Sequence, residues 1–318
     1  MDITIIGHIC KDYIHPKKNG KSAENIEPLW GGIFYAIATL ANLASLKDSI
    51  MPIFSIGEKD YDELIERLRL YPNVSTEGIY RTKTPTNEVH LIYSAGQNRI
   101  ECSKNIALSI PFKKIQPFLK ADALLINMIS GYDITLETLD FIRLAIREQD
   151  VQSFIDFHSL TLGINDDFTR FRTPLIEWRR WAFMMNHVQM NQEEAKSLTL
   201  ERMDEDTLAK QLLSLDVASL LITKASKGAT LYTLHHKNFF RFDSVPEEKI
   251  KPVDTTGCGD VFGASYLYHF LQNMDAVAAV TFATHVAGIN AQYIGSSGID
   301  TIAQTLTEEQ FQKETKTQ

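Results

Sequence analysis

Short runs of β-branched residues alternate with longer amphipathic segments along most of this chain, and that alternation constrains its fold most strongly. Ile3–Ile9 and Ile50–Ile56 are rich in isoleucine and are predicted as strands, whereas Ile33–Leu46 gathers alanine and leucine on one helical face. Strands that alternate with helices pair in parallel, because each connecting helix returns the chain to the same edge of the sheet. The pattern predicts an α/β fold with a mostly parallel sheet.

The same alternation continues towards the C-terminus. Further strands are predicted at Ala123–Asn127, Gln152–Asp156, His187–Met190 and Ser219–Thr223. Further helices are predicted at Tyr61–Leu70, Leu136–Arg147, Gln192–Leu198, Thr207–Leu215, Val261–Gln272 and Ala276–Gln292.

One region departs from this alternation. Gly78–Arg81, Asn87–Ser94 and Arg99–Ser103 are predicted as short strands with no helix between them, and residues 95–98 have the composition of a hairpin turn. Such strands predict a small antiparallel sheet inserted into the α/β body. This sheet is a candidate lid over a cleft, although a surface flap without a gating role fits the strands equally well.

Composition narrows the class of partner. The chain has 318 residues with 32 basic and 40 acidic side chains, so its formal net charge is −8. Nucleic-acid and membrane-surface binding need clustered cations, and the acidic balance argues against both. Three scattered cysteines without a CxxC pair, and an N-terminus without a signal-peptide pattern, favour a reducing, cytoplasmic setting with a small-molecule substrate.

The segment Asp254–Gly263 carries the clearest chemical signal. It reads DTTGCGDVFG, a turn of small residues that runs directly into an amphipathic helix. The N–H groups of Gly257, Cys258 and Gly259 are expected at the helix N-terminus, where unpaired donors and the helix dipole favour an anion. Asp260 falls in the first helical turn. It can cap the helix, or it can act as a base on a hydroxyl group beside the bound anion.

This segment closely resembles the C-terminal signature of the PfkB/ribokinase family of carbohydrate kinases, with Cys258 in the position usually held by alanine. The resemblance extends along nearly the whole chain. It implies one ribokinase-like kinase domain over residues 1–318, with a three-layer α/β/α core and a small β lid inserted from roughly 10–30 and 76–106. It also implies ATP-dependent phosphoryl transfer to an alcohol, with Asp260 as the base and the backbone of 257–259 as the anion hole.

Two further positions resemble the substrate side of that family. Asp12 follows the first predicted strand, where the family has an aspartate that binds substrate hydroxyl groups. Gly31 and Gly32 resemble the N-terminal glycine pair, at which the backbone passes close to the substrate. By themselves, these residues indicate only a loop acid and a turn.

Positions on the donor side also match. Asn191 and Glu194 resemble the family's NxxE motif, which implies that Glu194 organises Mg²⁺ through water, although the same residues also form an ordinary helix N-cap. The resemblance implies nucleotide contacts at the residues Asn191, Thr223, Ala225, Gly228, Gly257, Gly259 and His285. ATP and Mg²⁺ are the implied cofactors, while a requirement for K⁺ and a homodimer formed through the lid remain open.

The departures from the family pattern gather on the substrate side. Ala36 stands where a sugar-binding asparagine is common, the segment 156–160 lacks the usual asparagine and arginine, and 129–132 lacks an acid. On the donor side, Ala225 replaces a glycine. The donor-side pattern is thus kept while the sugar-side pattern drifts, which favours a kinase with an unusual acceptor.

Three functions remain as hypotheses. The first is a sugar kinase, and the second is a nucleoside kinase of the same family, in which Phe34 and Tyr35 stack on a base unless they belong to the core. The third is a catalytically weak protein that senses a sugar or nucleotide. The retained Asp260 and its glycine-rich turn argue against the third.

Overall fold

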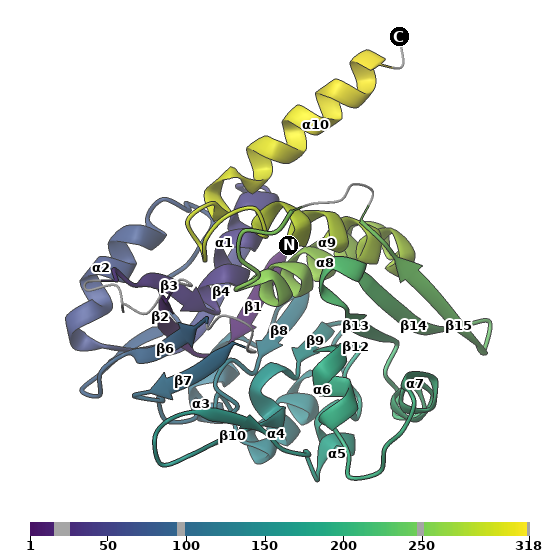
Figure 1. Ribbon diagram of the computed structural model, residues 1–318, viewed down its shortest axis with the longest axis horizontal. Coiled ribbons are helices and arrows are strands. Elements are labelled where there is room, and N and C mark those ends of the chain that lie inside the picture. The colour runs from purple at the N-terminus through teal and green to yellow at the C-terminus, as the bar shows by residue number, and fades with distance from the viewer. Residues whose placement is uncertain (16–25, 94–98, 247–250, 317–318) are drawn as a thin grey trace.

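A nine-stranded sheet forms the centre of the protein, and helices cover both of its faces (Figure 1). The structure is a computed structural model that describes residues 1–15, 26–93, 99–246 and 251–316. The strand order is β15 (Asn238–Ser244), β14 (Ala229–His235), β13 (Ser219–Thr223), β12 (His187–Asn191), β9 (Gln152–Asp156), β8 (Ala123–Asn127), β1 (Asp2–Ile6), β4 (Ser49–Gly57) and β5 (Ile79–Thr82).

All strands from β13 to β5 in that order run parallel, and only β14 and β15 are antiparallel to their neighbours. The central strands are buried on both faces, which explains their nearly continuous apolar sequences. Ile5, Leu125 and Phe154 are fully buried in this core. The predicted α/β fold with a mostly parallel sheet is confirmed.

Helices α1 (Phe34–Leu43), α8 (Cys258–Asn273) and α9 (Ala276–Asn290) cover one face of the sheet (Figure 1). The other face carries α4 (Leu136–Ile146), α5 (Trp178–Ala182), α6 (Gln192–Ser197) and α7 (Glu205–Leu213). The remaining helices are α2 (Glu58–Leu68), α3 (Phe112–Ile115) and α10 (Ile302–Lys316), with 3₁₀ turns at Gln116–Phe118, His158–Thr161, Ala225–Lys227 and Ile299–Thr301. No helix in these described ranges has the length and apolarity needed to cross a membrane.

A second sheet projects from the carboxyl edge of the first and forms the lid. Its strand order is β3 (Leu29–Gly32), β2 (Ile9–His15), β6 (Asn87–Ile92) and β7 (Ile100–Lys104). The β6–β7 pair is antiparallel, as predicted, and so is the β2–β3 pair, for which no prediction was made, but the central pair β2–β6 is parallel. The reason is that β2 follows β1 and β6 follows β5, and β1 and β5 run in the same direction in the main sheet.

The lid differs from the prediction in one strand. Residues 79–82 form β5, which pairs with β4 at the edge of the main sheet, so this segment belongs to the body. The predicted turn at residues 95–98 lies outside the described residues, as do 16–25 of the predicted lid segment 10–30.

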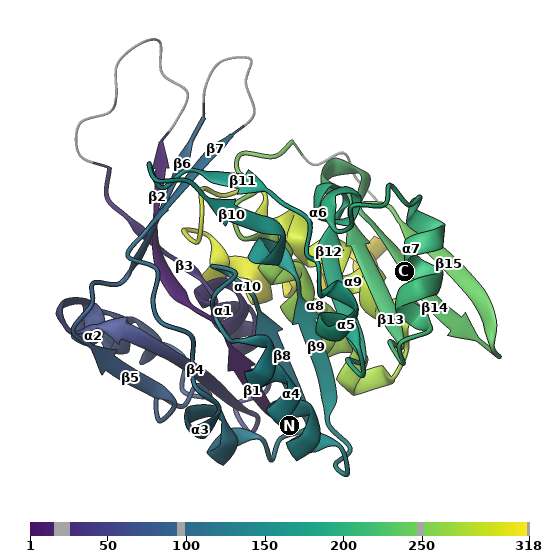
Figure 2. The same cartoon turned by 90° about the horizontal axis from the view of Figure 1, so that it is seen from below.

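A short hairpin was not predicted at all. Strands β10 (Leu162–Ile164) and β11 (Arg170–Arg172) pair with each other, and the hairpin lies beside the lid (Figure 2). The N–H group of Ser103 in β7 donates a hydrogen bond to the carbonyl oxygen of Phe168 at 3.0 Å. The hairpin is therefore attached to the lid through the backbone.

Candidate active site

The carboxyl ends of four neighbouring parallel strands carry polar residues. Asn127, Asp156, Asn191 and Thr223 are the last residues of β8, β9, β12 and β13. Because the carboxyl ends of parallel strands lie at the same edge of a sheet, these residues share one edge, where α/β proteins bind ligands, and this edge is called the candidate cleft below. The N-terminus of α8 reaches the same edge, since Asn127 Nδ2 donates to Asp260 Oδ1 at 2.9 Å.

The turn before α8, Gly257–Gly259, is called the glycine turn below. Gly257 has φ +74°, and a Cβ atom there would lie 2.2 Å from the Tyr35 ring, so only glycine fits. Among the described residues, the N–H groups of Gly257 and Gly259 have no acceptor, whereas that of Cys258 donates to the Thr255 carbonyl oxygen at 3.3 Å. Two free donors thus lie at a helix N-terminus, rather than the three expected from the sequence.

Asp254 holds the glycine turn in place. Its Oδ1 accepts hydrogen bonds from the Thr256 N–H (3.1 Å), the Thr256 hydroxyl (2.8 Å) and the Tyr93 hydroxyl (3.0 Å). Its Oδ2 accepts one from the Gly295 N–H at 2.9 Å. Tyr93 directly follows lid strand β6, so this carboxylate also links the lid to the turn.

Asp260 is buried, and its environment favours the protonated form. Burial raises the pKa of its carboxyl group to about 7, the hydrogen bond from Asn127 opposes that shift, and the nearby Asp12 and Glu194 carboxylates add to it. A proton acceptor works best when its pKa lies near the working pH. Asp260 is therefore poised to exchange a proton near neutrality.

Asp12 reaches the same cleft from lid strand β2. It accepts hydrogen bonds from the Cys10 thiol (3.2 Å) and the Tyr35 hydroxyl (3.3 Å), and burial raises its pKa to about 6. A Cβ atom on Gly31 would lie 2.1 Å from Asp12 Oδ2, so the adjacent strand approaches the carboxylate closely only because residue 31 is glycine. Gly32 has φ +62° and directs the chain into α1.

Two further buried acids, Asp156 and Glu194, lie close to the ends of β9 and β12. Gln189 Nε2 donates both to Asp156 Oδ2 (2.8 Å) and to the Gly259 carbonyl oxygen (2.9 Å), which fixes α8 against the sheet. Asn191 and Glu194 form a capping box at the start of α6. Burial raises the pKa of Glu194 to about 7, and burial together with the Glu194 and Asp260 charges raises that of Asp156.

The residues predicted to contact a nucleotide divide into two groups. Thr223 is paired with Asn191 in the sheet, and Gly228 closes the turn after β13 with φ +82°. Ala225 lies in the same turn and has φ +50°, in the left-handed region that the usual glycine would adopt without strain. These residues line the cleft beyond Asn191.

His285 is placed differently. Its Nε2 lies 2.5 Å from Glu309 Oε2 of α10, so the side chain is engaged with the C-terminal helix. The preceding residue, Thr284, is the one that contacts the end of β15, through a 2.9 Å hydrogen bond with the Ser244 hydroxyl. A contact between His285 and a nucleotide therefore stays a prediction, and in this structure the side chain is bonded to α10.

Sequence reasoning missed several side chains at this site. Ligands bind at the carboxyl ends of parallel strands, and applying this rule to each predicted strand end would have identified Asn127. Tyr35 is buried and supports both Asp12 and the glycine turn. Phe34 is buried too, so neither ring is free to stack on a base. Arg172 lies 3.7 Å from Glu194 and comes from the unpredicted hairpin, for which no sequence signal was found.

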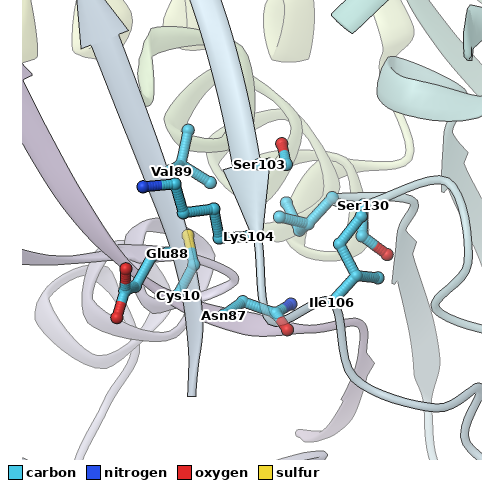
Figure 3. Close-up of a pocket in the computed structure, with 9 residues that line it drawn as sticks. Cys10, Asn87, Glu88, Val89, Ser103, Lys104, Ile106 and Ser130 are labelled. Atoms are coloured by element: carbon cyan, nitrogen blue, oxygen red, sulfur yellow. The ribbon is translucent and has the colours of Figure 1, made fainter. Parts of the chain in front are cut away.

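A small cavity lies between the lid and the body, lined by Cys10, Asn87, Glu88, Val89, Ser103, Lys104, Ile106, Ile129 and Ser130 (Figure 3). Its volume of about 10 Å³ has room for one water molecule. Cys10 Sγ and Ile129 Cγ2 also lie 3.1 Å from the position of a Cβ atom on Gly32. Next to the glycine pair, the lid thus presents the Cys10 thiol and the body presents the apolar Ile129 side chain.

The described ranges contain no group of three or more histidine, cysteine or carboxylate side chains arranged to hold a metal ion. Mg²⁺ commonly keeps several waters and binds through substrate phosphates with one or two carboxylates. Asp156, Glu194 and Asp260 lie close enough to influence one another's pKa, and this acidic set fits such a water-rich ion. The residues present therefore suit a metal that arrives with the donor.

Comparisons with known proteins agree on one family. A sequence model of the pfkB family of carbohydrate kinases matches residues 1–302. The chain is 25% identical to ribokinase from Bacillus subtilis (strain 168) over 221 residues, covering 68% of this chain and 66% of that one. It therefore spans just under two thirds of the length of this curated relative.

Solved structures show the same fold. Ribokinase from Thermotoga maritima superimposes with a TM-score of 0.72 at 19% identity, covering 96% of this chain and 99% of that one. A pyrophosphate-dependent kinase in the ribokinase family gives a TM-score of 0.73 at 18% identity, covering 92% and 96%. The predicted ribokinase-like fold with its small lid is confirmed.

Proposed function

Because the chain belongs to the pfkB family of carbohydrate kinases, we propose that it transfers the γ-phosphoryl group of ATP to a hydroxyl group of a sugar. One observation carries this proposal: the buried Asp260 carboxyl group lies in the same helical turn as the free N–H groups of the glycine turn. A proton acceptor is thereby placed beside an anion site. Phosphoryl transfer to an alcohol needs this combination.

In the proposed reaction, the acceptor oxygen forms a bond to the γ-phosphorus while the bond to the ADP oxygen breaks. Asp260 takes the hydroxyl proton, and Asn127 keeps its carboxylate oriented through the 2.9 Å hydrogen bond. The Gly257 and Gly259 N–H groups stabilise the charge on the transferring group, because they are fixed before the reaction and need no reorganisation.

The two substrates are proposed to bind on opposite sides of Asp260. Asp12 and the backbone at Gly31 and Gly32 bind the acceptor beneath the lid. The nucleotide extends along the strand ends past Asn191 towards Thr223, Ala225 and Gly228. Mg²⁺ would be held by the phosphates and, through water, by Glu194, and when bound it would neutralise phosphate charge.

Two alternatives remain. A nucleoside kinase uses the same chemistry on a ribose hydroxyl, but the buried Phe34 and Tyr35 remove the stacking surface on which that hypothesis relied. A sensing protein would bind its ligands without turnover. The intact arrangement of Asp260, Asn127 and the glycine turn favours an enzyme over a sensor.

The test is ADP release with Mg²⁺ and ATP across sugars, sugar phosphates and nucleosides, and release of inorganic phosphate where pyrophosphate replaces ATP as the donor. The Asp260→Asn protein provides the background rate, and Asp206→Asn, which alters an acid that pairs with Arg241 on the surface, provides the matched control. Release that depends on a sugar supports the proposal. Release only with nucleosides favours the first alternative, and no release above background favours the sensor.

A further inference from the structure

The β10–β11 hairpin connects two parts of the molecule that are distant in sequence (Figure 2). Besides the backbone bond from Ser103 to Phe168, Arg170 Nη1 donates to the Ser103 hydroxyl at 3.3 Å and Nη2 to the Ser130 carbonyl oxygen at 2.9 Å. Arg170 Nε also donates to the Gly163 carbonyl oxygen at 3.2 Å. Arg170 is thus used to hold the hairpin against the lid and the body.

Arg172, two residues further along β11, is bonded much less completely. Within the described part of the chain its one hydrogen bond runs from Nη1 to the Thr161 hydroxyl at 2.9 Å. The same nitrogen lies 3.7 Å from Glu194 Oε1, and the side chain is 40% exposed. A guanidinium group carries five N–H donors, so most of those of Arg172 remain free for a ligand.

The position of Arg172 follows from the order of the strand ends. Along the sheet edge the order is β13, β12, β9, β8, which places Thr223, Asn191, Asp156 and Asn127 in succession towards Asp260. A donor whose nucleoside lies near Thr223 and whose γ-phosphoryl group reaches Asp260 must pass its phosphates across the Asn191–Glu194 segment. Arg172 lies beside Glu194 of that segment, whereas Lys196, a second cation there, is paired with Glu193.

Charge supports the same placement. Asp156, Glu194 and Asp260 are buried acids at one edge of the cleft, and a triphosphate that approaches them is repelled. A fixed guanidinium group binds phosphate oxygens in a bidentate manner and offsets this repulsion. The two N–H donors of the glycine turn carry no net charge, so they do not offset this repulsion by themselves.

We propose that Arg172 binds the terminal phosphates of the donor and that the β10–β11 hairpin holds Arg172 in position through its attachment to the lid. This inference rests on the proposed kinase function. It adds a donor-binding residue from a segment outside the glycine turn, and it makes donor affinity dependent on the placement of the hairpin.

The test measures binding to the full-length protein by isothermal titration calorimetry, without turnover. Arg172→Met is expected to weaken binding of the non-hydrolysable ATP analogue AMP-PNP with Mg²⁺ by about 10-fold or more, the value of one charged contact. Binding of AMP, which lacks the terminal phosphates, is expected to stay unchanged. Should Arg172→Met not fold, Arg172→Gln takes its place with the same expectation.

Arg180→Met is the matched control. Arg180 is a partly exposed arginine of α5, and it pairs with Asp140 of α4 and with Glu177. It is expected to leave both affinities unchanged. Equal AMP-PNP affinity for Arg172→Met and the unmodified protein would overturn the inference and leave the proposed function intact. An unmodified protein that binds neither AMP-PNP nor pyrophosphate would overturn both.

A double-mutant cycle tests the role of the hairpin. Arg170→Met is expected to weaken AMP-PNP binding several-fold in the unmodified background and to have no further effect in the Arg172→Met background, because its influence passes through Arg172. Additive effects of the two substitutions would show that the hairpin does not position Arg172.

Discussion

The glycine turn and the lid are the two walls of the candidate active site, and they are built in different ways. The turn is one contiguous segment, in which Asp254 and the Gly257 conformation fix the backbone and Asp260 follows directly. The lid is assembled from four strands separated in sequence, and its inner face mixes Asp12 with Cys10 and Val89. The comparison indicates that the proposed chemistry is specified locally, whereas acceptor selectivity is distributed over several segments.

The largest expected effect comes from the turn. Asp260→Asn keeps the shape of the side chain but removes the proton acceptor, so kcat is expected to fall by about 10²–10⁴-fold. Steady-state kinetics of ADP release measure this loss, with Asp206→Asn as the control. A variant with near-normal turnover would mean that the turn does not carry the proton transfer.

The same substitution is expected to stabilise the protein at high pH. The pKa of Asp260 is raised in the folded state to about 7, so its contribution to stability is fully present below its usual pKa of 3.8 and is lost as pH rises through about 7. Asparagine does not titrate. The free energy of unfolding of Asp260→Asn should therefore exceed that of the unmodified protein by up to about 4 kcal/mol at pH 8, and by less at pH 5.

Urea unfolding of the two proteins at pH 5 and pH 8 measures this difference. A stability difference that stays constant between the two pH values would contradict the raised pKa of Asp260.

Gly257→Ala tests whether the geometry of the turn matters as much as its acid. The added methyl group meets the Tyr35 ring, and φ +74° is unfavourable for alanine, so the turn must shift. We expect about a 10²-fold loss of kcat, comparable to loss of an anion-hole donor, together with a lower melting temperature. Gly259→Ala is the control for the steric effect of an added methyl group, since a Cβ atom there meets no atom closer than 3.7 Å.

Asn127→Ala is expected to move the pH dependence of activity. Asn127 stabilises the charged form of Asp260, so its removal raises the pKa of that carboxyl group by about one unit. Since the base must be deprotonated, the rising limb of the kcat/KM profile should shift to higher pH, with a loss of about 5-fold at neutrality. A lower kcat/KM without a shift in the profile would indicate a role unrelated to Asp260.

The smallest effect is expected on the lid side of the site. Ile129→Val shortens the side chain that lies beside Gly32 by its terminal Cδ1 carbon and should change KM for the acceptor by about two- to threefold, with little change in kcat. A change in kcat as large as that of Gly257→Ala would erase the contrast between the two walls. Steady-state kinetics of ADP release with the sugars, sugar phosphates and nucleosides named above measure both KM and kcat.

The sequence predicts the glycine turn well because its residues are neighbours, and short-range constraints such as a positive φ leave a visible pattern of glycines. The six central strands of the main sheet, from β13 to β4 in its order, are predicted for the same reason, as they are apolar runs. Strands β14 and β15 were not predicted, and β5 was assigned to the lid. The parallel pairing of β2 with β6 depends on where two distant strands emerge from the body. The contact of His285 with Glu309 likewise depends on tertiary packing of α10, which no local pattern in α9 reveals.

Tyr35 links the two walls through a single side chain. Its hydroxyl group donates to Asp12 of the lid, its ring fills the space beside Gly257, and its oxygen lies 3.4 Å from the Cβ position of Gly295. Asp12, the proposed acceptor-binding acid, and the glycine turn, the proposed donor-binding segment, therefore share one buried spacer. Transplanting this turn into another scaffold therefore requires Tyr35 as well. Redesign of the site for another acceptor is constrained by the distance between Asp12 and Gly257, which the Tyr35 ring sets.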